Sequence, residues 1–377
     1  MEKSLRVLHV TNVVLGNPYT GLPLPLCRER YHRFPEVFDS LFTYIEEEGI
    51  DLVLFAGNLT GRYLTSDDAA HLIEKLSASP CRFVIAPGDQ DPYAPDSLYA
   101  TGRLPANVSV FDTDALHRFD FDFDGLPVTV WGWAMLGQRT STAPLAGAAV
   151  TDPARINLLT GCCDIGARTL FARVTPEEIA AFGADYAGFS HGPATEVKVA
   201  GRTRYCHGGF LEGRSFEELG IGGFRRIDIT EDRAARTVEV SFVPLSRHHF
   251  ETVVMDITGV YEMSEVLDRL HALVTEHGFS EDTSLRVILE GELHPTVMLR
   301  PSPEEGKLFS LYSLEFVDRT LPILDAEEFE RDMSVRGELY RTLRPRLDSQ
   351  NLDERAAAAR ALRVGLAALE SRDITLL

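Results

Sequence analysis

Short apolar segments that each end in polar or glycine residues recur through the first half of the chain. They read LRVLHVTN, IDLVLFAGN, CRFVIAPGD, LPVTVWGWA, ARINLLTGCC and ADYAGFSHG. Continuous apolar runs of this length are typical of strands that are buried on both faces. The pattern therefore predicts an α/β fold. Its strands would form a sandwich or a layered sheet in which both faces of each strand are covered.

Amphipathic segments lie between these runs. Residues 34–49 carry a regular apolar face and predict a helix that ends at its final glycine. Residues 66–79 begin with Ser66 as a helix cap and continue with an acidic first turn. Thr175 and Glu178 have the spacing of a capping box and predict the start of another helix.

The second half of the chain changes in character from about residue 225. The segments FRRIDI, RTVEVSFVPL and FETVVMDI predict strands that cover the sheet. The amphipathic segment EMSEVLDRLHALVTEHG and two further strand segments then predict a small α+β domain. We therefore expect a main domain over 1–249, an α+β cap over 250–322 and a helical segment over 323–377.

The composition limits the classes of protein that the chain can represent. Its 44% hydrophobic and 25% charged residues are typical of a globular protein, and the chain has no long apolar run that would span a membrane. The five cysteines lack C-x-x-C spacing and no signal-peptide pattern precedes the first strand, so we expect a cytoplasmic protein without disulfides. The net charge of −20 leaves room only for local basic patches if DNA is bound.

Polar side chains follow several of the predicted strands. Ligands in open α/β sheets bind at the carboxyl ends of strands, so these side chains are the natural candidates for a site. Each taken singly is also an ordinary turn or core residue. The candidate residues are Asn12, Asn58, Asp89, Thr160 and His191.

These segments resemble the calcineurin-like metallophosphoesterases, and among them the SbcD-type DNA repair exonucleases of the YhaO branch. The resemblance rests on VLHVTNVVLG, IDLVLFAGNLTG, the GDQD of residues 88–91, INLLTG and SHGP, in that order along the chain. LEGRSFEELGIGGF and the C-terminal segments DMSVRGELYRTL and ALRVGLAALESRDI extend it over nearly the whole chain. It implies a four-layer α/β/β/α metallophosphoesterase sandwich with a C-terminal α+β cap and terminal helices.

The chain departs from the family at the first of its two metal sites. The resemblance places Asn12 where the family has an aspartate, and Val14 and Pro193 where it has histidines. Valine and proline side chains have no ligand atom. The resemblance therefore implies that this first site is lost.

The second metal site is changed in a different way. Asn58 stands for the aspartate that bridges the two ions, Asp89 for a ligand asparagine and Thr160 for a histidine, while His191 is unchanged. Two interpretations stay open. Asn58, Asp89, Thr160 and His191 hold one Mn²⁺ or Mg²⁺ weakly, or Asp89 and His191 form a hydrogen-bonded pair with no ion.

The expected catalytic residues are altered as well. Gln90 replaces the family's histidine in the loop after the third strand, and a glutamine amide cannot act as a general acid. Asp91 is expected to support that loop, and His191 is the remaining catalytic candidate. A thiol nucleophile at Cys162 or Cys163 is an alternative, although buried packing explains these cysteines more simply.

The resemblance implies a non-catalytic or weakly active subunit of a DNA-processing complex. It also implies an SbcC-like SMC-type ATPase as partner and a homodimer, with DNA as a candidate ligand. Leu362, Leu366 and Leu369 form a stripe that fits either docking of this partner or packing inside their own domain. The alternative functions are an active single-metal phosphoesterase or nuclease, and a structural interaction protein unrelated to DNA.

Overall fold

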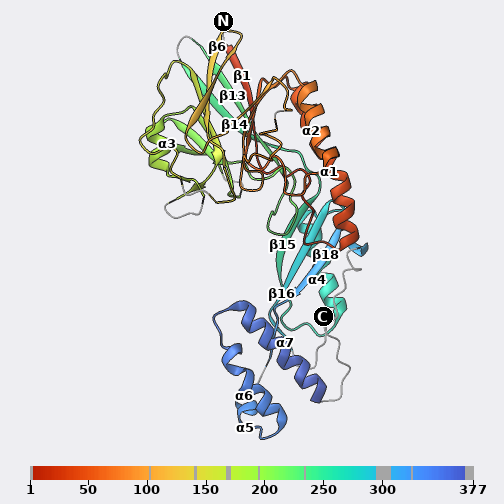
Figure 1. Cartoon of the computed structure of the whole chain (residues 1–377). Coiled ribbons are helices and arrows are strands. Elements are labelled where there is room, and N and C mark those ends of the chain that lie inside the picture. Colours follow the sequence, from red (N-terminus) through yellow and green to blue (C-terminus); the bar gives the residue numbers. More distant parts are fainter. Residues whose placement is uncertain are drawn as a thin grey trace. The chain divides into compact units, whose positions relative to one another are not determined.

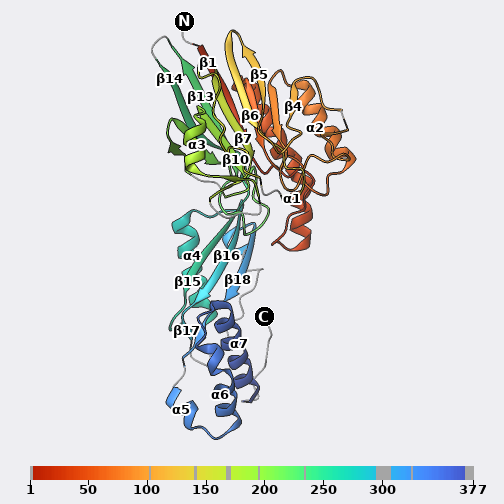
Figure 2. The same cartoon turned by 60° about the vertical axis from the view of Figure 1, so that its left-hand side comes forward.

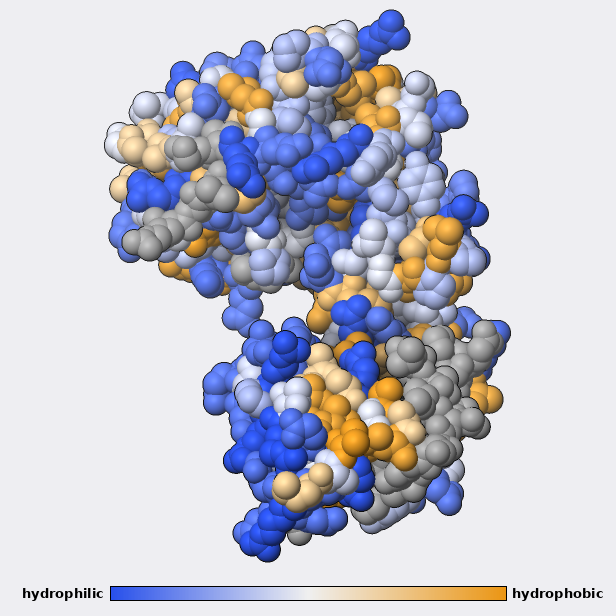
Figure 3. All heavy atoms as spheres, turned by 60° about the horizontal axis from the view of Figure 1, so that its bottom comes forward, coloured by the Kyte–Doolittle hydropathy of each residue, from blue (hydrophilic) through white to orange (hydrophobic). Residues whose placement is uncertain are grey.

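The structure is a computed structural model that describes residues 3–101, 103–139, 142–166, 171–193, 196–232, 235–293, 307–323 and 326–369. The chain divides into two compact units, Met1–Arg247 and His248–Leu377. In the ribbon views of Figures 1 and 2 the first unit runs from red to green and the second from green to blue. Hydrophilic side chains cover most of the face shown in Figure 3, with apolar side chains in smaller groups between them.

The described part of the first unit contains two six-stranded sheets. The first has the order β14-β13-β1-β2-β3-β4, with β1 (Lys3–Val10), β2 (Leu52–Ala56), β3 (Arg82–Ala86), β4 (Val108–Val110), β13 (Gly223–Glu231) and β14 (Arg236–Pro244). The second has the order β11-β12-β10-β7-β6-β5, with β5 (His117–Phe123), β6 (Leu126–Gly132), β7 (Ile156–Cys162), β10 (Tyr186–Ser190), β11 (Lys198–Ala200) and β12 (Thr203–His207). The pair β8 (Asp164–Ile165) and β9 (Arg173–Val174) lies beside them.

The apolar runs of the sequence form the strands at the centre of both sheets. β1, β2, β3 and β4 are parallel to one another, as are β6, β7, β10 and β12. Antiparallel strands lie at one edge of the first sheet, β13 and β14, and at both edges of the second, β5 and β11. Parallel strands with both faces covered need apolar residues on both sides of the chain, which is why these runs do not alternate.

Three layers of buried apolar side chains lie between the sheets and helices of the first unit. Leu54 of β2 and Leu158 of β7 belong to the layer between the two sheets. The opposite face of the first sheet packs on α1 (Leu24–Glu47) and α2 (Ser66–Ala78), and the outer face of the second packs on α3 (Pro176–Phe182). Figures 1 and 2 show α1 and α2 together on one side of this unit and α3 on the other. The first unit is therefore a four-layer α/β/β/α sandwich, as predicted.

Helix α1 begins at Leu24, ten residues before the predicted start at Phe34, and continues through Pro35. Its added part carries Arg30, which is 7% exposed and forms an ion pair with buried Glu212. This partner lies far away in the sequence, so apolar periodicity gives no signal of it. The cap of α2 is Thr65, one residue before the predicted Ser66. Thr175 and Glu178 form the predicted capping box of α3.

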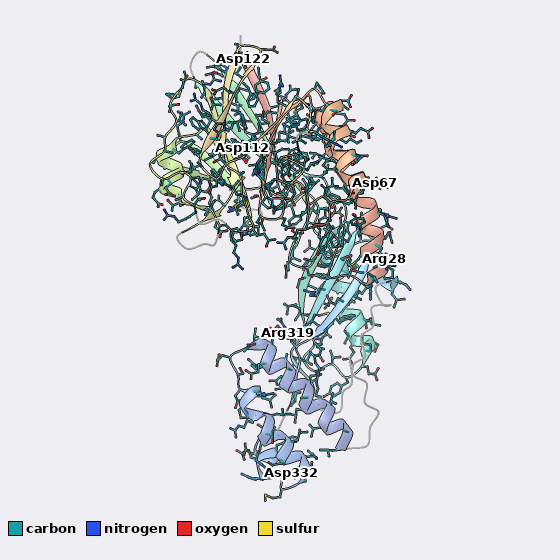
Figure 4. The ribbon with its side chains drawn as sticks, viewed as in Figure 1. Arg28, Asp67, Asp112, Asp122, Arg319 and Asp332 are labelled. Carbon is teal, nitrogen blue, oxygen red and sulfur yellow. The ribbon has the colours of Figure 1, made fainter. Side chains whose placement is uncertain are left out.

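The second unit is built on a three-stranded parallel sheet with the order β15-β16-β18. Its elements are β15 (His249–Asp256), α4 (Met263–His277), β16 (Thr283–Glu290), β17 (Glu292–Leu293), β18 (Ser313–Asp318), β19 (Leu321–Pro322), α5 (Ala326–Arg331), α6 (Val335–Leu347) and α7 (Leu352–Leu369). The segment FETVVMDI is thus β15 and pairs with β16, whereas the sequence pattern placed it with strands that cover the main sheet. Arg319, labelled in Figure 4, follows β18 and pairs with Asp353 of α7.

The C-terminal leucine stripe packs mostly inside its own unit. Leu362 and Leu366 are 0% and 3% exposed and form a small core with Phe329 and Tyr340, whereas Leu369 is 44% exposed. Of the two explanations for the stripe, internal packing accounts for the first two leucines. In the described residues, none of the helices is long and apolar enough to cross a membrane.

We expect Thr175→Ala to lower the free energy of unfolding of the first unit by about 1 kcal/mol. Thr175 Oγ1 accepts a hydrogen bond from the Glu178 backbone N–H at 3.2 Å, and the Glu178 side chain accepts one from the Thr175 N–H at 2.9 Å. Helix α3 packs Phe182 against Trp131, with ring centroids 5.6 Å apart. Both tryptophans of the chain, Trp131 and Trp133, lie in this unit, so urea unfolding followed by tryptophan fluorescence reports on it.

Thr43→Ala is the matched control, because Thr43 is exposed on α1 and caps no helix. Its effect should stay within about 0.5 kcal/mol. Equal effects of the two substitutions would contradict the role of the capping box.

Candidate functional site

The candidate residues are brought together because three of them follow neighbouring strands. β1, β2 and β3 are adjacent in the first sheet, and Asn12, Asn58 and Asp89 lie just beyond their carboxyl ends. Asn12 and Asn58 have positive φ angles of 46° and 52°. Backbone in this left-handed region is sparsely populated by residues other than glycine and is concentrated at functional sites.

A chain of hydrogen bonds joins these three side chains. Asn12 Nδ2 donates to the Gly209 carbonyl at 2.6 Å. Asn58 Nδ2 donates to both Asn12 Oδ1 and Asp89 Oδ1, at 3.0 Å each. Asn58 Oδ1 accepts from the Gln90 backbone N–H at 3.0 Å. The Asn58 amide therefore lies between the two other side chains and supplies hydrogens to both.

Backbone groups at both ends fix the donor and acceptor directions of these side-chain hydrogen bonds. A backbone N–H can only donate, so the Asn58 atom that faces Gln90 must be the oxygen. A carbonyl oxygen can only accept, so the Asn12 atom that faces Gly209 must be the nitrogen. Rotating either amide by half a turn would place like groups against each other. The donor of Asn58 is thus fixed toward Asn12 and Asp89.

These residues do not fit the two-ion centre of the metallophosphoesterases. The Asn58 amide presents hydrogens to the oxygens of Asn12 and Asp89, whereas a bridging ligand must present a lone pair to a cation. Val14 and Pro193 bring no ligand atom to the first site. Within the described ranges, no group of three or more His, Cys, Asp or Glu side chains is placed to hold a metal ion.

Gln90 is held beside these hydrogen-bonded side chains by a third asparagine, Asn17. Asn17 Nδ2 donates to Gln90 Oε1 at 2.6 Å, and the same asparagine accepts from the Arg62 N–H at 2.9 Å. Gln90 Oε1 is therefore already engaged. The side chain is half-buried and can offer amide hydrogens but no acidic proton.

Asp91 is buried and joins the loops after β2 and β3. Its carboxylate accepts from the backbone N–H groups of Asn58 and Thr60 at 3.0 Å and of Gly88 at 2.7 Å, and from the Tyr99 hydroxyl at 2.5 Å. Burial raises the pKa of Asp91 to about 6, although the hydrogen bonds lower it. The carboxylate is therefore ionised at neutral pH and fixes the backbone that carries Asn58.

The loop after β1 is fixed by a buried ionic network. Arg214 donates to the carbonyls of Val13 at 2.9 Å and Asn17 at 2.8 Å, and its guanidinium stacks on the Phe34 ring at 4.2 Å. Glu212 accepts from Arg30 and, at 2.9 Å, from the Ser246 hydroxyl. The network joins Glu212 and Arg214 of the LEGRSFEELGIGGF segment to the residues that they contact. It positions Asn17 against Gln90.

His191 is paired with a residue that the sequence analysis missed. Its Nδ1 lies 2.7 Å from Asp164 Oδ1, and its ring packs on Phe171 with centroids 3.6 Å apart. The backbone φ of His191 is 92°. Asp89 and His191 thus have different partners, Asn58 and Asp164, instead of each other. The available signal for Asp164 was its position directly after the strand that carries Thr160.

The remaining candidates, which lie on β7 or directly after it, are fully buried. Thr160 is 0% exposed, and in the described part of the chain its hydroxyl has no hydrogen-bond partner. Burial raises the pKa of the Cys162 thiol to about 12 and holds that of Cys163 well above its usual range. A thiolate at either position is therefore disfavoured, and both cysteines act as packing residues.

Two further histidines near the site are also structural. His9 is fully buried, and burial lowers its pKa to about 3, so it is neutral and shares a hydrogen bond with the Tyr186 hydroxyl at 2.9 Å. Burial likewise lowers the pKa of His207, whose Nε2 lies 3.2 Å from the Cys163 carbonyl. Neither of them is among the candidate residues that the sequence predicts.

A pocket of about 570 Å³ opens beside Asn12 and His191. Gly192, Gly208 and Gly209 form part of its lining, together with carboxylate and apolar side chains. The other lining residues are Pro193, Phe210, Glu217, Glu218, Leu219, Ile221 and Phe242. Glycine is required at 192, because a Cβ there would lie 2.9 Å from the His207 ring.

Comparison with protein-family models gives no match, and neither does comparison with curated protein sequences. Among solved structures, the chain is similar to a putative 5′-nucleotidase from Staphylococcus aureus, with 11% identity, a TM-score of 0.42 and coverage of 64% of this chain and 54% of that one. It is also similar to TT1561 of Thermus thermophilus (14% identity, TM-score 0.38, coverage 64% and 99%) and to a dimetal phosphatase from Danio rerio (7%, 0.38, 64% and 99%). Because these TM-scores are low, the fold class is assigned from the sheets and apolar layers described above. The proposed function is argued from the geometry of the site.

We expect Asp91→Asn to lower the free energy of unfolding of the first unit by about 3 kcal/mol. An asparagine keeps one acceptor oxygen and turns its NH₂ group toward backbone N–H donors that the carboxylate now satisfies. The comparison belongs at pH 8, where a carboxyl with a pKa of about 6 is ionised. Urea unfolding with tryptophan fluorescence measures the change.

The control is Asp67→Asn in the exposed first turn of α2 (Figure 4). It should cost no more than about 1 kcal/mol, since it removes only a charge near a helix N-terminus. An Asp91→Asn effect of the same size would show that Asp91 does not hold the two loops together.

Proposed function

We propose that this chain is an SbcD-type member of the calcineurin-like metallophosphoesterases that has lost its two-ion centre and works as a non-catalytic subunit of a DNA-processing complex. The observation that carries the proposal is the Asn58 amide, which donates to Asn12 and Asp89 where the family motif has a carboxylate shared by two ions. The four-layer sandwich and the place of these residues at the ends of β1, β2 and β3 support the family.

The chemistry of the family requires what these side chains cannot supply. In two-metal phosphoesterases the ions clamp the phosphodiester and generate hydroxide. Here the Asn58 amide donates hydrogens to Asn12 and Asp89, and Gln90 cannot protonate a leaving group. Losing one such donor alone costs on the order of 10²-fold in rate. Binding without hydrolysis is the function that remains.

The direct test is metal binding and phosphodiesterase activity in millimolar Mn²⁺. We expect no stoichiometric Mn²⁺ by elemental analysis after gel filtration, and no Mn²⁺-dependent cleavage of bis(p-nitrophenyl) phosphate or of DNA. The alternative function is an active single-metal phosphoesterase with an ion at Asn58, Asp89, Thr160 and His191. Bound Mn²⁺ together with activity that disappears in Asp89→Ala would establish the alternative and overturn the proposal.

The substitution Asn58→Asp tests whether the Asn58 amide stabilises the site in place of a bound metal ion. Without metal the new carboxylate faces Asp89 and loses both donated hydrogen bonds, so we expect destabilisation of about 2–3 kcal/mol. Millimolar Mn²⁺ should raise the unfolding midpoint of this variant and leave the wild-type midpoint unchanged, because a ligand that binds only the folded state stabilises it.

Asn58→Ala is the matched control for this experiment. It loses the same hydrogen bonds but gains no carboxylate, so it should be destabilised and show no response to Mn²⁺. A wild-type protein that Mn²⁺ stabilises as strongly as Asn58→Asp would show that the native site already holds an ion.

The proposed partner is an SbcC-like SMC-type ATPase, on the ground of the resemblance in the C-terminal segments. With Leu362 and Leu366 buried, such a contact would use exposed residues of α7, of which Leu352 is 57% exposed. Co-expression with an SMC-type coiled-coil ATPase, if a neighbouring gene encodes one, tests the assembly, because a stable complex elutes as one species in gel filtration. Separate elution of the two proteins would remove this partner.

A further inference from the structure

The helices at the end of the second unit have an apolar cluster of their own. Phe329 of α5, Tyr340 of α6 and Leu362 and Leu366 of α7 are its buried members. The apolar side chains of α4 and of the sheet β15-β16-β18 form a different cluster. Among the described residues, no side chain belongs to both. The helical segment α5–α7 and the sheet are thus not joined through a common apolar cluster.

The side of α7 that lies next to β18 carries few large apolar side chains. A hollow of about 410 Å³ is lined by both elements, with Val317 on β18 and Ala356, Ala361 and Val364 on α7. Alanine buries little apolar area, so it contributes little to the docking of one element on another. The leucines of α7 pack against α5 and α6 instead.

A buried ion pair joins α7 to the end of β18. Arg363 of α7 pairs with Asp318, the last residue of β18, and the two side chains are 10% and 15% exposed. Arg363 also donates to the hydroxyl of buried Thr320 at 2.7 Å. Asp318 accepts from the N–H of Thr320 at 2.9 Å and from its hydroxyl at 2.7 Å. These three side chains form one connected polar contact between the helix and the strand.

Two further polar contacts join the same elements, and both are weaker. Arg319 pairs with Asp353 at 3.3 Å, but the Asp353 side chain is 83% exposed. Arg360 donates to the Asp318 backbone carbonyl at 3.3 Å. Exposed ion pairs contribute little to stability because water screens them. Breaking a buried pair from one side is far more costly, because it leaves a charge without a partner out of water.

We propose that the Asp318–Arg363 ion pair holds α5–α7 docked on β18, and that these helices open as one cooperative unit when the pair is broken. A cluster of four buried residues is small for a segment that has to stay folded alone. The sheet and α4 keep their own larger cluster and should stay closed. The inference goes beyond the proposed function and does not depend on it, because every contact involved lies within this chain.

Hydrogen exchange of the full-length protein, followed by mass spectrometry, tests this inference through two single variants. Asp318→Asn takes the carboxylate away from Arg363, and Arg363→Met leaves Asp318 with only the hydrogens of Thr320. Each should speed amide exchange throughout α6 and α7 about 100-fold, while exchange in α4 and β16 changes by less than about threefold.

Arg363→Met is the deciding variant, because it keeps the contacts of Asp318 with Thr320 at the end of the strand. Unchanged exchange in α6 and α7 of this variant would overturn the inference, since the pair would then not hold the helices. An equal rise in α4 and β16 would overturn it as well, since the second unit would then open as a whole.

Arg319→Gln is the matched control, because it removes an exposed ion pair between the same two elements. Exchange in α6 and α7 should change by less than about threefold. A change as large as that in Arg363→Met would mean that any lost charge near α7 opens the helices, and the specific role of the buried pair would be refuted.

The double variant Asp318→Asn with Arg363→Met shows whether the two side chains act on each other. Each single variant leaves a buried group without its partner, whereas the double variant removes both charges. Its effect on exchange in α6 and α7 should therefore be smaller than the product of the two single effects. An effect equal to that product would show that the two residues act independently, which contradicts the inference.

Discussion

The carboxylate of Asp91 is the contact on which the geometry of the site depends. It collects backbone N–H groups from the loops after β2 and β3 together with the Tyr99 hydroxyl, and all of these lie out of reach of solvent. Because the Asn58 N–H is one of its donors, Asp91 holds Asn58 in left-handed backbone conformation. The Asn58 side chain can then meet Asn12 and Asp89, and the site follows from that position.

Amide and carboxylate groups surround Asn58 and line the neighbouring pocket. The Asn58 amide donates hydrogens to both Asn12 and Asp89. The carboxylate of Asp89 is thus paired with an amide hydrogen. The pocket next to it carries carboxylates of its own.

The sequence predicted the parts of this arrangement that depend on local pattern. The apolar runs gave the central strands, and the end of each run gave Asn12, Asn58 and Asp89, because parallel strands deliver their carboxyl ends to one edge. The capping box at Thr175 was equally visible. The early start of α1 was not predicted, and the added part of this helix carries Arg30, whose ion-pair partner Glu212 lies far along the chain. The pairing of β15 with β16 also depends on partners far along the chain.

By itself the sequence determined which chemical groups are present: amides, one carboxylate and a valine at positions where the family motif that it resembles has carboxylates and imidazoles. Only the tertiary structure decided how those groups are used. It directs the Asn58 amide toward Asn12 and Asp89, gives His191 to Asp164, and leaves Glu218 at the wall of the pocket. The reason is physical: residue type fixes what an atom can donate or accept, whereas the partner it meets is chosen by backbone that contacts distant in the sequence hold in place.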